Sequence, residues 1–149
     1  MNVLTEALER LSAQEARERD DASAALGDLL HCGSLGQQEA ELAVSHLMAL
    51  ALDDPDHSVQ ESALNSIGET PLHRDLPLRL VEALAPALAG MTPDLLEHAI
   101  GILGATRAPA ARTMIEPFLE HAVGFIREAA NITLAELPVH GSQQIPTAR

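Results

Sequence analysis

Four segments of this chain align with one another without gaps, and this internal repeat limits the possible folds more than any other feature. The segments are ERDDASAALGDL (18–29), VQESALNSIGET (59–70), LLEHAIGILGAT (95–106) and IREAANITLAEL (126–137). The ninth residue of each is Leu or Ile, and the tenth is Gly or Ala. The tenth residues are Gly27, Gly68, Gly104 and Ala135, at spacings of 41, 36 and 31 residues. Small residues let one helix backbone approach its neighbour closely, so the repeat predicts helices that stack against one another.

A second amphipathic segment precedes each of these four. These preceding segments span about 2–11, 37–52, 77–89 and 109–121, with apolar residues at helical spacing. Helix-start signals support the division: SAQE (12–15) has the form of a capping box, Asp56 precedes a helix, and Pro93 is at a first helical position. Leu and Ala, both strong helix formers, supply much of the apolar share of 46%. We therefore predict an all-α fold, with one domain over residues 1–137 and a flexible tail over 138–149.

The repeated pairs resemble the HEAT-repeat family, whose unit is a first helix, a turn and a second helix. The segment DDPDHSVQESALNSIGE (53–69) carries the resemblance most fully, and GFIREAANITLAEL (124–137) keeps the Ile-Arg pair typical of the start of the second helix. The resemblance implies a short right-handed α-solenoid of about four helix pairs. Gln60 and Leu96 depart from the pattern, because the family often has Arg at their place. A continuous ladder of Arg and Asp between repeats is therefore not predicted.

The charge of the chain is strongly negative and unevenly distributed. The formal net charge is −13, no lysine occurs, and the stretch from Asp20 to His73 has ten carboxylates and no Lys or Arg. Such a field repels nucleic acids and anionic membranes and attracts basic partners. No apolar run approaches the length of about 18 residues that a membrane span needs, and MNVLTEALERLSAQE lacks the features of a signal peptide. We expect a cytoplasmic protein that binds neither nucleic acid nor membranes.

Acidic residues recur at two places of the repeated segment. The third place holds Asp20, Glu61, Glu97 and Glu128, and the eleventh holds Asp28, Glu69, Ala105 and Glu136. The third, seventh and eleventh places share one helical face, which points outward when the apolar places face the core. In proteins of the HEAT-repeat family the second helices line the concave binding surface, so the resemblance implies an acidic stripe there. The candidate binding residues are Asp20, Asp28, Glu61, Glu69, Glu97 and Glu128.

The near-identical hexapeptides LEHAIG (96–101) and LEHAVG (119–124) raise the question of a duplicated metal site. Glu97-His98 falls at the start of a second helix, whereas Glu120-His121 falls at the end of a first helix. Adjacent helical residues also diverge by about 100°, so neither dipeptide chelates alone. Deoxyhypusine hydroxylases of the HEAT-repeat family use His-Glu dipeptides, and none occurs here. The turn with Asp53, Asp54 and Asp56 fits a helix cap better than a calcium loop. We expect no metal and no cofactor.

These observations predict a binding protein rather than an enzyme. The predicted partner is another protein with a basic surface, which could form bidentate Arg–carboxylate contacts with the stripe. Two forms of this function are an immunity-type inhibitor of a basic toxin and an adaptor in a larger assembly. An alternative for the stripe is a solvated surface that only maintains solubility. An alternative function is an enzyme or chromophore handler of the lyase or hydroxylase type found among HEAT-like proteins.

Overall fold

The computed structural model describes residues 2–138, and every regular element among them is helical. The α-helices are α1 (Val3–Arg10), α2 (Ala16–Cys32), α3 (Gln37–Asp53), α4 (His57–Ile67), α5 (Leu78–Val81), α6 (Pro93–Ala105), α7 (Ala111–Ile115) and α8 (Gly124–Glu136). Three 3₁₀ helices, η1 (Thr70–Leu72), η2 (Glu82–Gly90) and η3 (Glu116–Glu120), join them. The predicted all-α class is confirmed. The predicted tail, residues 138–149, lies outside the described residues from 139 onward.

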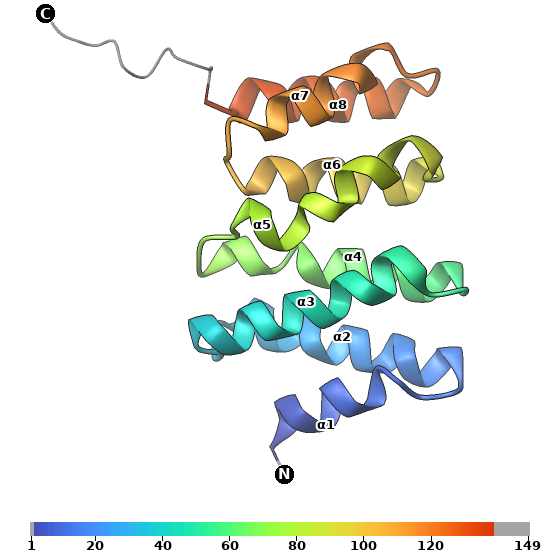
Figure 1. The fold of residues 1–149 in the computed structure, drawn as a ribbon, viewed down its shortest axis with the longest axis vertical. Coiled ribbons are helices and arrows are strands. Elements are labelled where there is room, and N and C mark those ends of the chain that lie inside the picture. Colours follow the sequence, from blue (N-terminus) through green and yellow to red (C-terminus); the bar gives the residue numbers. More distant parts are fainter. Residues whose placement is uncertain (1, 139–149) are drawn as a thin grey trace, which may run out of the picture.

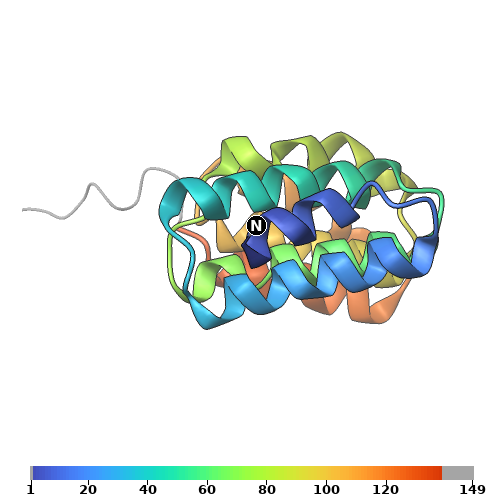
Figure 2. The same cartoon turned by 90° about the horizontal axis from the view of Figure 1, so that it is seen from below.

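The helices form layers that follow the chain from one end of the molecule to the other (Figure 1). Each layer holds one first helix and one second helix, as the repeat predicts. The second helices α2, α4, α6 and α8 each pack against the next one, and α1 and α3 pack against α2 and α4. A view along the stack shows α3 on one side and α2 on the other (Figure 2). Consecutive repeats therefore bury a shared core between layers.

The buried residues follow the repeat closely. The fifth place is fully buried in all four segments, and the ninth place is buried in all four. These residues are Ala22, Ala63, Ala99 and Ala130, then Leu26, Ile67, Leu103 and Leu134. The sixth place is buried in the first three segments but is exposed at Asn131, on α8. One hydrophobic cluster extends from Leu4 to Leu137.

The first helices of the third and fourth pairs are broken, unlike the continuous helices that the periodicity predicts. α5 passes into η2, which contains Pro86, and α7 passes into η3, which contains Pro117 near its start. Proline has no N–H to donate and its ring clashes with the carbonyl four residues earlier, so an α-helix cannot continue regularly through it. The chain tightens to 3₁₀ geometry in both places.

The small tenth-place residues permit close helix packing at two of the four positions. A Cβ added to Gly27 would clash with Ser66 of α4, and one added to Gly104 would clash with Thr133 of α8. The Ser66 hydroxyl also donates a 2.7 Å hydrogen bond to the Ser23 carbonyl of α2. Gly68 instead follows the end of α4, and Ala135 is exposed. The packing role predicted for all four is confirmed for Gly27 and Gly104 alone.

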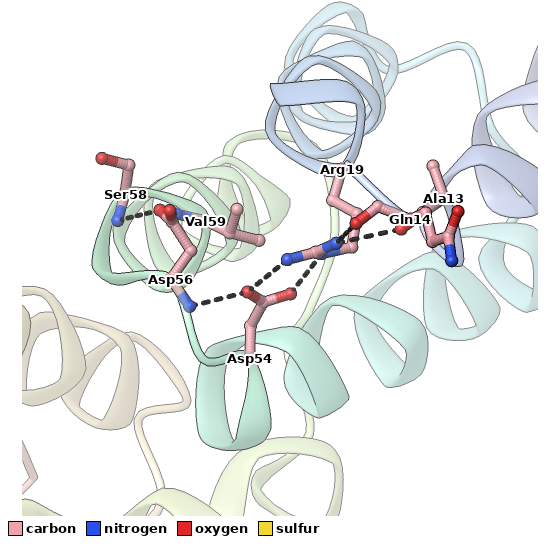
Figure 3. A network of polar contacts seen from close by, with 7 residues as sticks. All are labelled: Ala13, Gln14, Arg19, Asp54, Asp56, Ser58 and Val59. Carbon is pink, nitrogen blue, oxygen red and sulfur yellow. Dashed lines mark hydrogen bonds and ion pairs between the residues drawn. The ribbon is translucent and has the colours of Figure 1, made fainter. Parts of the chain in front are cut away.

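A buried ion pair joins the first two layers (Figure 3). Arg19 of α2 donates from Nε to Asp54 Oδ2 at 2.7 Å and from Nη2 to Asp54 Oδ1 at 3.1 Å. Its Nη1 donates to the carbonyls of Ala13 and Gln14. The predicted capping box at 12–15 is wrong: α2 begins at Ala16, after Glu15, without a side-chain cap, and this turn serves Arg19 instead. One rung of an Arg–Asp ladder is thus present.

The turn between α3 and α4 is fixed by its aspartates, as predicted. Asp54 Oδ1 also accepts a hydrogen bond from the Asp56 amide at 2.9 Å. Asp56 in turn caps α4, because its Oδ1 accepts from the amides of Ser58 and Val59. These contacts set where α4 begins relative to α2, and α4 carries the candidate acid Glu61, with Glu69 just after its end.

Candidate functional site

Five of the six predicted binding residues lie on the second helices, Glu69 lies just after the end of α4, and all six remain accessible to solvent. Asp20, Glu61 and Glu69 are half-buried, and Asp28, Glu97 and Glu128 are exposed. Seventh-place residues, Ala24, Asn65, Gly101 and Ile132, are exposed as well. The outward direction predicted for these places is therefore confirmed. We call the outward sides of α2, α4, α6 and α8, which carry the third, seventh and eleventh places, the even-helix face.

Three adjoining hollows on the even-helix face bring five of the six acids together. Asp20 and Glu61 line a hollow of about 390 Å³ with His98. Asp28 and Glu69 line one of about 290 Å³ between α2 and α4. Glu69 and Glu97 line one of about 340 Å³ between α4 and α6. Asn65 of α4 borders all three, so they form one continuous region.

Glu128 is the exception among the predicted site residues. It lies exposed on α8, and the lining of the three hollows comes from α2, α4, α6 and the residues just after α4. The acids therefore concentrate over the first three layers rather than running evenly along the stack.

Histidines pair with two of these acids, a feature that the sequence reasoning missed. His31 Nδ1 lies 2.8 Å from Glu69 Oε1, and His98 Nε2 lies 3.6 Å from Glu61 Oε2. Each pair links one second helix to the next layer, and it becomes an ion pair only when the imidazole is protonated. His98 comes directly after Glu97, the third place of the segment on α6, and it contacts Glu61, the third place of the segment on α4. Alignment of the two segments could therefore have indicated this pair.

The arginines with resolved partners bind groups other than these six acids. Arg19 binds Asp54, and Arg79 binds Glu41 at 2.8 Å. Arg74, Arg112 and Arg127 donate to backbone carbonyls. Within residues 2–138, none of the six acids forms an ion pair with arginine. The negative charge of the even-helix face is therefore not neutralised by neighbouring guanidinium groups.

A further group of side chains lies where α4 and α6 begin. His57, Glu61 and Asp94 place one potential ligand atom each within 4.8 Å of the others. Two contacts lower the pKa of Asp94 to about 2. The hydrogen bond from the Thr92 hydroxyl has the larger effect, and the hydrogen bond with His57 has the next largest. The same contact with Asp94 raises the pKa of His57. This set is not among the candidates that the sequence indicates, which are the Glu-His dipeptides and the aspartate turn.

Cys32 and His31 do not form a nucleophile pair. The Cys32 thiol donates to the Ser34 hydroxyl and the Leu29 carbonyl, whereas the His31 ring contacts Glu69. The hydrogen bond with Ser34 lowers the pKa of the exposed thiol.

Comparisons with known proteins show the fold and no family. No protein-family model matches the chain, and no curated protein matches it. Two crystal structures of engineered proteins are similar over 90% of this chain, with TM-scores of 0.64 and 0.65 at 17% and 16% identity. The chain spans 61% of the first of these proteins and 37% of the second. Within the described residues, no helix is both long enough and apolar enough to cross a membrane.

Proposed function

We propose that this chain binds a basic region of another protein through the even-helix face. The observation that carries the proposal is the grouping of Asp20, Asp28, Glu61, Glu69 and Glu97 around three adjoining hollows. We further propose that the stacked pairs form a HEAT-like solenoid, in which this face is the binding surface.

The hollows have the chemistry that long cationic side chains need. Each hollow is bordered by two carboxylates, one from each of two neighbouring helices or layers. A guanidinium group that enters between them can donate to both, and such charge-assisted hydrogen bonds are about twice as strong as neutral ones. The uncompensated charge would also accelerate encounter with a basic partner, an effect that salt screens.

Two forms of this function differ in what happens to the partner. An inhibitor of the immunity type would cover a basic active surface and abolish the activity of its partner. An adaptor would leave that activity intact and join the partner to a third component. An activity assay of the partner with and without this chain separates the two forms.

The decisive experiment reverses the charge of three acids on the face and leaves the His57 group unchanged. The partner is identified by mass spectrometry of the co-purified complex, and its Kd is then measured at low and high salt. We expect the triple variant Asp28→Lys, Glu69→Lys, Glu97→Lys to weaken binding at least tenfold and to flatten the salt dependence. These three acids line two of the hollows and include no member of the His57 group.

A matched control has the same change in net charge elsewhere. Glu9, Glu82 and Glu116 are exposed and lie on α1, η2 and η3, away from the second helices. Replacing these three with lysine should leave the Kd within about twofold of the original at high salt, where long-range effects are screened. Equal losses in the two triple variants would mean that net charge, and not this face, governs binding. An unchanged Kd in the first triple variant would contradict the proposal.

A further inference from the structure

Two His–carboxylate pairs face each other across the boundary between the second and third layers. His57 and Glu61 are four residues apart on α4, and Asp94 and His98 are four residues apart on α6. Residues at this spacing project from the same side of a helix, one turn apart. α4 and α6 pack against each other. The order of the two residue types is opposite on the two helices, so each histidine meets a carboxylate of the other helix.

Both cross-helix contacts are present in the structure. His57 Nε2 lies 2.6 Å from Asp94 Oδ2, and His98 Nε2 lies 3.6 Å from Glu61 Oε2. The ligand atoms of His57, Glu61 and Asp94 all lie within 4.8 Å of one another. A tetrahedral zinc ion with bonds of about 2.0–2.2 Å holds its ligand atoms roughly 3.3 Å apart. The observed separations lie on both sides of that value, so modest side-chain rotations would enclose an ion.

All four side chains are partly exposed, so there is room for small rotations and an ion can reach them. Their exposed fractions are 49% for His57, 45% for Glu61, 44% for Asp94 and 33% for His98. The helices, by contrast, are fixed: Asp56 caps the start of α4, and Pro93 occupies the first turn of α6. The backbone therefore holds His57, Glu61 and Asp94 close together with His98 next to Glu61, and only the outer atoms of the side chains have to adjust.

Asp94 is already oriented by a neighbouring residue. Its Oδ1 accepts a hydrogen bond from the Thr92 hydroxyl, while its Oδ2 points toward His57. Metal-binding carboxylates are commonly held by such an outer hydrogen bond, which fixes their direction and leaves one oxygen for the ion.

We propose that His57, Glu61, Asp94 and His98 bind one divalent transition-metal ion, with Zn²⁺ as the best match, and so clamp α4 to α6. Two imidazole nitrogens and two carboxylate oxygens form a four-ligand set that suits zinc, whereas Mg²⁺ and Ca²⁺ prefer oxygen ligands alone. The ion would join the second layer to the third, where no Arg–Asp rung lies in the described residues.

Zinc binding is measured on the full chain after removal of metals with a chelator. We expect equilibrium dialysis to give one Zn²⁺ per chain and thermal unfolding to show a Tm that rises with zinc concentration, because an ion that binds only the folded state stabilises it. Mg²⁺ at the same concentrations should leave the Tm unchanged. Absence of bound zinc after dialysis would overturn the proposal without any variant.

Substitutions then locate the ion. His57→Ala and His98→Ala should each lower the zinc affinity more than tenfold, and Thr92→Val should lower it by roughly tenfold through loss of orientation. His31→Ala removes a histidine that pairs with Glu69 on the same face, and it should leave zinc affinity unchanged. If the four groups form only crossed ion pairs, the His57 and His98 variants will lose stability while zinc fails to raise the Tm of the unsubstituted chain.

The zinc site and the proposed basic partner are tested separately. The triple variant Asp28→Lys, Glu69→Lys, Glu97→Lys keeps all four ligands, so it should still bind zinc after losing the partner. Undiminished zinc binding in His57→Ala and His98→Ala would overturn this proposal and leave the binding function untouched.

Discussion

Arg19 and Arg127 make the same two hydrogen bonds in the first and last layers of the stack. Nη1 of Arg19 donates to the carbonyls six and five residues before it, those of Ala13 and Gln14. Nη1 of Arg127 donates to the carbonyls at the same two offsets, those of His121 and Ala122. Both arginines occupy the second place of the repeated segment. At the first junction Arg19 also binds Asp54 of the next layer, which turns a local contact into a link between repeats.

Asp54 should therefore contribute more to stability than its neighbour. We expect Asp54→Asn to lower the free energy of unfolding by about 1.5–3 kcal/mol, the usual contribution of hydrogen bonds to charged groups. Asp53 is exposed, and its replacement by Asn should change stability by less than about 0.5 kcal/mol. Urea denaturation of the two variants measures the difference. Similar midpoints for the two would show that the ion pair does not link the layers energetically.

The same carboxylate makes stability depend on pH in a defined direction. Burial raises the pKa of Asp54, but the hydrogen bonds from Arg19 and from the Asp56 amide outweigh it and leave the pKa below its ordinary value. The unfolded chain therefore takes up this proton at a higher pH than the folded chain does. The stabilisation is complete above the unfolded pKa of about 3.9 and is lost as the pH falls through the depressed folded value. Unfolding followed from about pH 6 to about pH 3 should show a smaller loss in Asp54→Asn than in the original chain. Parallel curves would contradict this assignment.

Two glycines of the second helices should respond to alanine in opposite directions. A Cβ at Gly27 would lie 3.2 Å from the Ser66 Cα and closer still to the Ser66 side chain, so the helices must separate. We expect Gly27→Ala to destabilise by about 1–3 kcal/mol through overpacking. Gly101 lies mid-helix on α6 with open space beside it, so Gly101→Ala should stabilise by about 0.5–1 kcal/mol. Thermal or urea unfolding gives both values, and stabilisation by Gly27→Ala would show that α2 and α4 pack loosely.

The cap of α4 can be tested with a conservative pair of substitutions. Asp56 Oδ1 accepts from the Ser58 amide at 2.9 Å and from the Val59 amide at 3.3 Å. Asp56→Ala should cost about 1 kcal/mol, because two amides lose their partner, whereas Asp56→Asn should be nearly neutral, since Asn caps helices as well as Asp does. Chemical denaturation compares the two. A loss of the same size in Asp56→Asn would point to the charge of Asp56 rather than its cap.

The repeat and its outward places could be predicted because both depend on helical periodicity. Ala22 and Leu26 are buried and Asp28 is exposed, as their places in the segment require. The breaks in the first helices of the third and fourth pairs could have been predicted from Pro86 and Pro117. The periodicity of apolar residues does not reveal them. The capping box predicted at 12–15 is wrong because the local sequence is compatible both with a capping box and with a turn whose carbonyls bind Arg19. The choice between them depends on Asp54, 35 residues away from Arg19.

The sequence by itself determined the all-α class, the division into helix pairs and the outward direction of the six acids. All three follow from the spacing of apolar residues within single helical segments. Only the tertiary structure decided which residues meet across layers. The offset between neighbouring helices depends on how closely their backbones approach, at Gly27 and Ser66 for example, and on where each turn ends. That offset puts His57 opposite Asp94, gathers the acids around hollows over three layers, and leaves Glu128 apart from them.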